Sequence, residues 1–242
     1  YQEITNRVFD SDHNVRNQSV YNYLEEGGLL LDVQEIRNLQ FLNGNVTEQR
    51  IATYSGAIDD PKTVLYDVKV IFNEGLNALG YADKTTIFKY ASGSIDDDPS
   101  MAGLYDGAIQ YWNPMDVTVI STTLFDNRGN AIEQTVTKYY DQAKLVLAQT
   151  QIIANQPYDF HDRQTKSVIT TKSATNNEID TQEIFYDSYD DYGNVLTQRI
   201  FRYADSAMAN FIDYKTILNV YTDNDPLTTA DAIAARRGNA IR

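Results

Sequence analysis

The sequence predicts an all-β protein built from tandem long antiparallel β-hairpins of about 32 residues, stacked into an extended or curved sheet with very little helix. Two observations predict this fold class: one residue pattern repeats at fixed spacing, and Gly-Asn pairs separate runs rich in β-branched and aromatic residues. The composition agrees, because 18 tyrosines accompany only 12 glycines and 5 prolines. That balance is typical of strands joined by compact turns.

The repeated pattern is Asn, three residues, Gln, one residue, Val or Ile, two residues, Tyr. Asn14 precedes Asn45 by close to one repeat of about 32 residues, and Asn130 precedes Asn194 by two repeats. Matches at fixed positions in several copies indicate tandem structural units rather than chance. The copies are Asn14, Gln18 and Tyr23; Asn45, Gln49 and Tyr54; Asn130, Gln134 and Tyr139; and Asn194, Gln198 and Tyr203.

The period predicts one repeat array over residues 1–242. Hairpin turns are expected near residues 14, 45, 77, 130, 162, 194 and 226. The phase slips once, in an irregular insertion at about residues 92–114. The chain opens with Tyr1, and its last five residues, 238–242, copy the start of a hairpin, so we expect a fragment of a longer protein.

The turns are expected where Gly and Asn meet, because both residues tolerate positive φ. Short helices are expected only at residues 206–211 and 229–237. If equivalent strands stack side by side, the four Gln residues of the motif would lie in register as a ladder of paired side-chain amides.

The overall charge restricts the classes of partner. The chain has 34 acidic and 20 basic residues, a formal net charge of -14, which argues against nucleic acid as a partner because phosphate backbones are repelled. It has no cysteine, so a disulfide framework, a thiolate zinc site and a cysteine nucleophile are excluded. No apolar run approaches the ~18 residues that a membrane span needs.

Calcium is the metal that the acidic turns suggest. Asp10, Asp12 and Asn14 place oxygen ligands at alternate positions, as calcium loops do. Asp190 and Asp191 lie in a similar acidic segment. Asp and Asn also favour turns for backbone reasons, and no downstream Glu completes an EF-hand loop. These five residues are candidate calcium ligands with a purely structural role as the alternative, and no cofactor is predicted.

Catalytic patterns are absent from the sequence. The two histidines, His13 and His161, both lie at expected turn tips without the neighbours of a catalytic triad. There is no glycine-rich phosphate loop, so the chain is not predicted to be an enzyme. Trp112, near Tyr105, is interpreted as the cap of a hydrophobic core, with a carbohydrate-stacking platform as the alternative.

Two segments carry a family resemblance. Tyr189-Asp190-Asp191-Tyr192-Gly193-Asn194-Val195-Leu196 and Phe125-Asp126-Asn127-Arg128-Gly129-Asn130-Ala131-Ile132 resemble the RHS/YD repeats of bacterial cell-surface and toxin proteins. They are also similar to the repeat region of the Tc-toxin B component. The resemblance implies long β-hairpins that wind into a large sheet or hollow shell. It also implies a bacterial protein that is secreted or displayed at the cell surface.

The sequence therefore predicts a structural β-repeat segment that builds a wall, stalk or filament. Its expected partners are other copies of itself, or further repeats of the same chain, joined through open sheet edges. Two alternatives stay open. One is an RHS/Tc-like toxin-encapsulating shell segment, and the other is a glycan-binding adhesin module that uses Trp112 and Tyr105.

Overall fold

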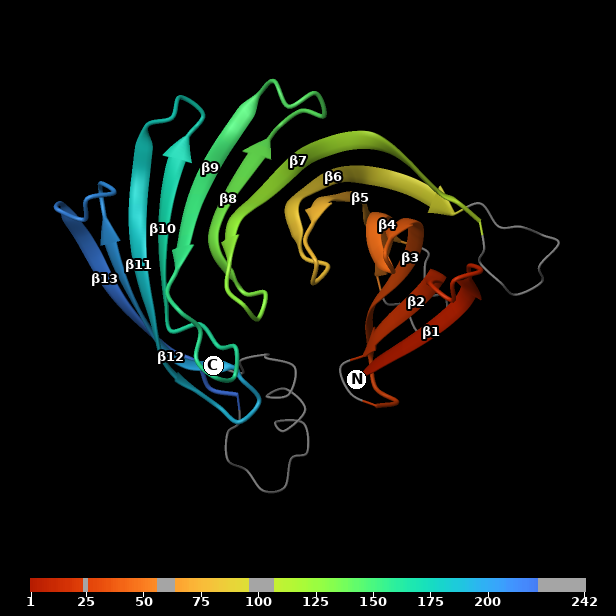
Figure 1. Cartoon of the computed structure of the whole chain (residues 1–242), viewed down its shortest axis with the longest axis horizontal. Coiled ribbons are helices and arrows are strands. Elements are labelled where there is room, and N and C mark those ends of the chain that lie inside the picture. The colour runs from red at the N-terminus through yellow and green to blue at the C-terminus, as the bar shows by residue number, and fades with distance from the viewer. Residues whose placement is uncertain (24–25, 56–63, 96–106, 222–242) are drawn as a thin grey trace. The chain divides into compact units, whose positions relative to one another are not determined.

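A computed structural model describes residues 1–23, 26–55, 64–95 and 107–221 of the 242-residue chain. Within these ranges every regular element is a β-strand, and thirteen strands form one sheet in simple sequence order, from β1 to β13 (Figure 1). The predicted all-β sheet of consecutive antiparallel hairpins is confirmed. Among the described residues, no helix is long and apolar enough to cross a bilayer.

The strands vary in length, and the longest are β6 and β7. They are β1 (Gln2–Phe9), β2 (Val15–Tyr23), β3 (Leu30–Leu42), β4 (Asn45–Ser55), β5 (Leu65–Leu76), β6 (Ala82–Ile95), β7 (Ile109–Phe125), β8 (Ala131–Tyr139), β9 (Leu147–Asn155), β10 (Lys166–Ser173), β11 (Glu178–Tyr189), β12 (Val195–Tyr203) and β13 (Phe211–Leu218).

The chain forms two compact units. Unit 1 comprises Tyr1–Val119 and Lys138–Leu147, and unit 2 comprises Ile120–Thr137 and Ala148–Arg242. Strands β1 to β6 lie wholly in unit 1, and β10 to β13 lie wholly in unit 2. The hairpin of β7 and β8 contributes to both.

Unit 1 contains a hydrophobic core on one face of its strands. Val33 on β3 pairs with Tyr54 on β4, Ala52 on β4 pairs with Val68 on β5, and all four side chains belong to this core. The strand β6 bends along its length in Figure 1, and Ile109 at the start of β7 is fully buried in the same core. The segment just before β7 is fixed there too, because Arg37 Nε donates to the carbonyl oxygen of Gly107 at 2.9 Å. The start of β7 therefore covers the inner face of β3 and β4.

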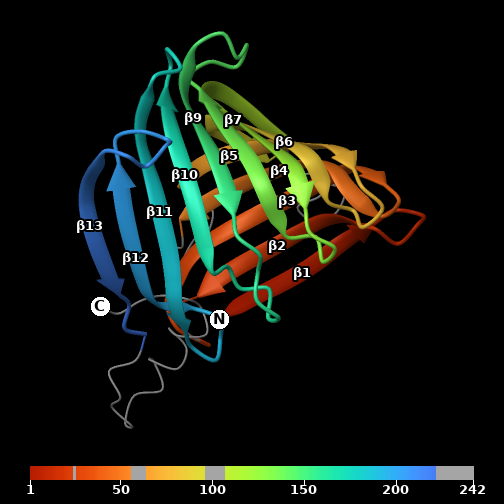
Figure 2. The same ribbon diagram turned by 60° about the vertical axis from the view of Figure 1, so that its left-hand side comes forward.

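Unit 2 is stabilised by contacts between side chains of neighbouring strands. Figure 2 shows β10 to β13 side by side. The ring of Phe201 on β12 packs edge-on against Phe185 on β11, with centroids 5.9 Å apart, and lies 4.8 Å from Tyr214 on β13. Cross-strand aromatic pairs of this kind stabilise a sheet by burying area between adjacent strands. The Thr170 and Thr181 hydroxyls form a buried hydrogen bond between β10 and β11.

Two local expectations change with the structure. The helix expected at residues 206–211 is wrong: these residues belong to a turn closed by the Ala204 N–H, which donates to the Asn210 carbonyl oxygen, and Phe211 already begins β13. The outer parts of the expected insertion at residues 92–114 are strand, since β6 runs to Ile95 and β7 begins at Ile109. The helix expected at residues 229–237 and the turn expected near residue 226 lie outside the described residues.

Candidate functional site

The motif copies that begin at Asn14, Asn130 and Asn194 follow a turn with one shared structure, which we call the Asp turn and define at Asp190–Asn194. The Oδ1 atom of Asp190 accepts hydrogen bonds from the N–H groups of Tyr192 and Asn194, at 2.9 and 2.8 Å. Its Oδ2 atom accepts from Asn194 Nδ2 at 2.8 Å. The same two backbone donors bond the first side chain in the turns at residues 10–14, 77–81, 126–130 and 159–163.

The fourth residue of each Asp turn has a left-handed backbone. Gly193 has φ of 85°, and Gly129 has φ of 91°. Glycine takes this conformation without steric cost, and Asp, Asn and His are the side chains that tolerate it best. The other copies follow that preference, with His13 at 63° and Asp162 at 61°. The motif is thus a backbone requirement first.

The candidate calcium ligands take part in these turns. Both carboxylate oxygens of Asp10 accept hydrogen bonds, from the N–H groups of Asp12 and Asn14 and from Asn14 Nδ2. Asp190 is engaged in the same way, whereas the side chains of Asp12 and Asp191 are exposed. Among the described residues, no group of three or more His, Asp or Glu side chains is arranged to hold a metal ion. The structure thus places two of the four candidate carboxylates in hydrogen bonds within their own turns.

Successive Asp turns contact one another along the sheet. In unit 2, Arg128 Nη1 lies 2.8 Å from Asp162 Oδ1 and donates to the Asp159 carbonyl oxygen at 2.8 Å. The side chain of Asn130 donates to the same Asp162 oxygen at 2.8 Å. A residue of one turn therefore binds the equivalent turn one repeat later. In unit 1 the Asp turn at residues 77–81 lies against the end of the β3–β4 hairpin, since a Cβ at Gly80 would lie 2.5 Å from Asn45 Oδ1.

The expected glutamine ladder is wrong. Gln18 on β2 lies between Asn6 on β1 and Ile36 on β3, and its side chain donates to Asn6 Oδ1 at 2.8 Å. Gln49 on β4 donates to Asn38 Oδ1 at 2.7 Å. One repeat contains two strands, so equivalent glutamines are separated by a whole strand. Gln134 donates to the Thr122 hydroxyl, and Gln198 lies opposite Tyr186.

The tyrosines of the motif do not form one site. Tyr54 is buried in the core of unit 1, and Tyr139 is half-buried. The Tyr23 hydroxyl donates to Glu3 Oε2 at 3.3 Å, and the Tyr203 ring packs against Phe211. Each serves the packing of its own hairpin.

A second repeated constellation was missed from the sequence. Asn155 Nδ2 and Tyr158 Oη both donate to the carbonyl oxygen of Ala131, at 2.8 and 3.1 Å. Asn219 and Tyr221 donate in the same way to the first residue of β12, at 2.9 and 3.1 Å. The signal in the sequence is that the two asparagines lie two periods apart, each followed closely by a tyrosine. We call this arrangement the Asn-Tyr clamp.

The turns at the other ends of the strands, which join β8 to β9 and β12 to β13, were also missed from the sequence. Both Asp141 carboxylate oxygens accept from the Leu145 N–H, and Asp205 accepts from the N–H groups of Ala209 and Asn210. These two turns are again two periods apart, and each closely follows a motif tyrosine. The positive φ falls on lysine or methionine rather than glycine, which is why residue type did not reveal them.

The two histidines both lie in Asp turns. His13 is the left-handed residue of its Asp turn, and the His161 ring lies 3.7 Å from the Phe160 ring between centroids. Among the described residues, neither side chain has a hydrogen bond or ion pair to a carboxylate.

The interpretation of Trp112 as a core cap is wrong. Its side chain is 47% exposed, whereas the preceding residue, Tyr111, packs against the core of unit 1. Strand alternation explains the difference, because neighbouring residues of β7 point to opposite faces. Tyr105, the other half of the suggested platform, lies outside the described residues.

A buried ion-pair cluster lies beside the core of unit 1. Glu35 is fully buried on β3, and its carboxylate binds Arg37 Nη1 at 2.9 Å and Arg7 Nη2 at 2.5 Å. The Ser19 hydroxyl donates to the other Glu35 oxygen at 2.7 Å. Removing one partner from such a cluster leaves a buried charge uncompensated, so it fixes the register of β1 to β3.

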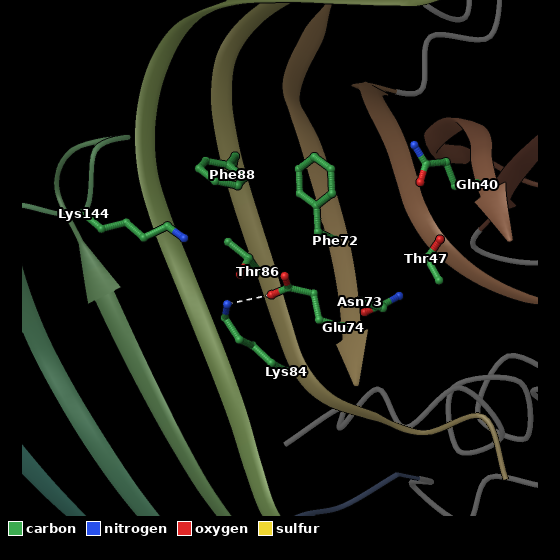
Figure 3. Close-up of a pocket in the computed structure, with 9 residues that line it drawn as sticks. All are labelled: Gln40, Thr47, Phe72, Asn73, Glu74, Lys84, Thr86, Phe88 and Lys144. Atoms are coloured by element: carbon green, nitrogen blue, oxygen red, sulfur yellow. Dashed lines mark ion pairs between the residues drawn. The ribbon is translucent and has the colours of Figure 1, made fainter. Parts of the chain in front are cut away.

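Unit 1 also contains a pocket of about 390 Å³ (Figure 3). Phe72 and Glu74 line it from β5, and Lys84 and Phe88 line it from β6. Lys144 reaches it from the turn that follows β8. Gln40, Thr47, Asn73 and Thr86 complete the lining.

The phenol of Tyr189 has a strongly raised pKa. Burial raises the pKa of its phenol to about 12, and the neighbouring Tyr186 and Asp159 act in the same direction. The Tyr189 hydroxyl donates to the Gln164 carbonyl oxygen, and the Arg163 guanidinium lies 5.0 Å from its ring centroid. This residue therefore holds the loop before β10 against the end of β11.

No protein-family model matches the chain, and no curated protein sequence matches it significantly. The site geometry must therefore support a function by itself.

Proposed function

We propose that the chain is a structural β-repeat segment of a large bacterial surface or secreted protein, in which stacked hairpins build a wall, stalk or filament. The observation that supports this most is the recurrence of the same Asp-turn hydrogen bonds in five successive or near-successive turns. A catalytic site needs one constellation once. Hydrogen bonds that recur in the turns at one end of the strands instead give successive hairpins the same structure.

The links between turns support the same proposal. Arg128 and Asn130 both bind Asp162 in the turn of the following repeat, so the side chains of one turn also orient the next turn. In a repeat array, stability comes from such nearest-neighbour contacts. The role is non-enzymatic, and it needs no cofactor.

The two ends of the strand order supply the surface for association. Among the described strands, β1 and β13 each have a single neighbour. A strand with an unpaired edge presents backbone N–H and carbonyl groups to another strand. Copies of the chain, or further repeats, are therefore the proposed partners.

A toxin-encapsulating shell segment of the RHS/Tc kind is the second candidate. It is favoured by one observation: the two segments that carry the resemblance, residues 125–132 and 189–196, both form Asp turns with the same hydrogen bonds. This role requires many further copies of the repeat and an enclosed cargo.

Negative-stain electron microscopy and sedimentation velocity at rising protein concentration test the proposal. Long regular fibres support the structural polymer, and closed hollow particles support the shell. A monomer at every concentration contradicts both. The variant Ile212→Lys places a charge on the edge strand β13 and should reduce association. Ile152→Lys on β9 is the matched control, because the two isoleucines are 45% and 43% exposed.

A further inference from the structure

The pocket of unit 1 has an aromatic floor. The rings of Phe72 and Phe88 meet edge-to-face, with centroids 5.9 Å apart, and both side chains are half-buried. Thr86 on β6 is the cross-strand partner of Phe72 and is only 3% exposed. Figure 3 shows the two rings on adjacent strands above the Glu74 and Lys84 side chains.

The charges around this floor leave one cation without an ion pair. Lys84 Nζ lies 2.6 Å from Glu74 Oε2, so these two charges compensate each other. Lys144 Nζ lies 5.4 Å from the centroid of the Phe88 ring and forms no ion pair with any described residue. The pocket therefore carries a net positive charge within a chain whose formal net charge is -14. Such a place favours a carboxylate over a cation.

The far side of the pocket supplies neutral hydrogen-bonding groups. Gln40 and Thr47 line the side opposite Lys144 in Figure 3. Neither side chain has a hydrogen bond to another residue in the described part of the chain. An occupant with only apolar surface would remove water from these groups without replacing its hydrogen bonds.

We infer that this pocket binds one carboxylated sugar ring, a uronic acid residue. The C–H face of the ring packs on Phe72 and Phe88, and its carboxylate binds Lys144. Its hydroxyl groups bond Gln40, Thr47 and Glu74, the last of which accepts. The pocket volume of about 390 Å³ lies within the range of small-molecule sites.

The test uses the whole chain and three free probes: D-glucuronic acid, D-glucose as its neutral counterpart, and benzoate as an aromatic acid without hydroxyls. Saturation-transfer NMR and calorimetric titration should detect glucuronic acid. Glucose should bind about tenfold more weakly, because one charge-assisted hydrogen bond is lost. Binding of benzoate as tight as that of glucuronic acid would overturn the assignment of a sugar. So would the absence of any glucuronic acid signal.

Two variants locate the site. Lys144→Gln should weaken glucuronic acid binding about tenfold and leave glucose unchanged. Lys215→Gln removes the same charge from the exposed strand β13 and should change neither. Equal effects of both variants, or no effect of Lys144→Gln, would contradict the pocket as the site. This outcome is independent of the fibres or particles seen by electron microscopy.

Discussion

A single carboxylate organises each Asp turn. In the turn at residues 190–194, Asp190 accepts three hydrogen bonds, two of them from backbone N–H groups that have no strand partner. The donor and the acceptor are close neighbours in the chain, so little chain entropy is lost when they meet. The Asp that precedes each Gly-Asn pair is therefore as important to the turn as the glycine.

Replacement of Asp190 by alanine should lower the free energy of unfolding by about 1–2 kcal/mol, because two backbone N–H groups lose their acceptor. Asp191→Ala removes the same charge from the next, exposed residue and should change it by less than about 0.5 kcal/mol. Urea denaturation measures both values. Equal losses in the two variants would show that charge, and not the turn bonds, is responsible.

Residue types revealed some of these turns and concealed others. Gly129 and Gly193 gave a clear signal, because glycine followed by asparagine is rare inside a strand. Lys144 and Met208 gave none, since these side chains seldom adopt the positive φ that they have here. Their turns are held by Asp141 and Asp205 instead, a role that composition does not distinguish from an ordinary surface aspartate.

Three hairpins share an irregularity in strand register near the turn. The register of the β1–β2, β3–β4 and β11–β12 pairs shifts shortly before the turn in each case. A bulge at this position increases the local twist of the strand. The Asn-Tyr clamps tie the end of β9 to the first residue of β8, and the end of β13 to the first residue of β12. In the repeat of β11 and β12 the bulge, the Asp turn and the clamp occur together.

Gly80→Ala and Gly193→Ala separate the two roles of the turn glycine. Both residues have φ of 85°, so each variant should lose about 1–2 kcal/mol of stability from the left-handed backbone. Gly80→Ala should lose more, because its new Cβ would lie 2.5 Å from Asn45 Oδ1. Adding Asn45→Ala should recover the stability lost to this clash and leave the loss from the left-handed backbone unchanged. A double-mutant cycle by urea denaturation that shows no coupling would contradict contact between successive turns.

The antiparallel hairpin fold followed from the sequence, but the neighbours of each strand followed only in part. The motif lies on β2, β4, β8 and β12, and the strands between them carry no strong motif of their own. The glutamine ladder failed for this reason: Gln18 and Gln49 are both in marked strands, with β3 between them. Paired strands lie about 4.8 Å apart, so two strands of separation place the amides beyond hydrogen-bonding distance.

At the scale of the whole molecule, the turn aspartates make the stability of the fold depend on pH. The Asn14 side-chain amide holds the pKa of Asp10 below its ordinary value of 3.8. The Val146 N–H does the same for Asp141. A carboxylate whose pKa falls on folding stabilises the fold above its ordinary pKa, and that contribution is lost as the pH drops through the lower value.

The free energy of unfolding should therefore be constant from neutral pH to about pH 5 and decrease below about pH 4. Chemical denaturation at a series of pH values measures this. Asp10→Asn should lessen the decrease, since the amide oxygen still accepts the backbone bonds but does not titrate. A stability that rises on acidification would show instead that repulsion among the 34 acidic residues dominates.

The core and the pocket of unit 1 could not be derived from the repeat. The core and the pocket both depend on departures from the repeat. The start of β7 crosses the face of β3 and β4, and Lys144 lines the pocket from the turn that follows β8. The cluster of Arg7, Glu35 and Arg37 likewise joins strands that only the register brings together. A repeat predicts what its copies share, and these features belong to single copies.

The recurrence of the Asp turn also bears on how such a chain evolves. The hydrogen bonds inside the turn are the same in five copies, so the excision or duplication of one repeat-length segment in the gene would place turns of the same structure side by side again. Unequal recombination between the copies would therefore yield a foldable product more often than recombination within a globular domain. The length of the protein is then a heritable variable that changes by whole hairpins.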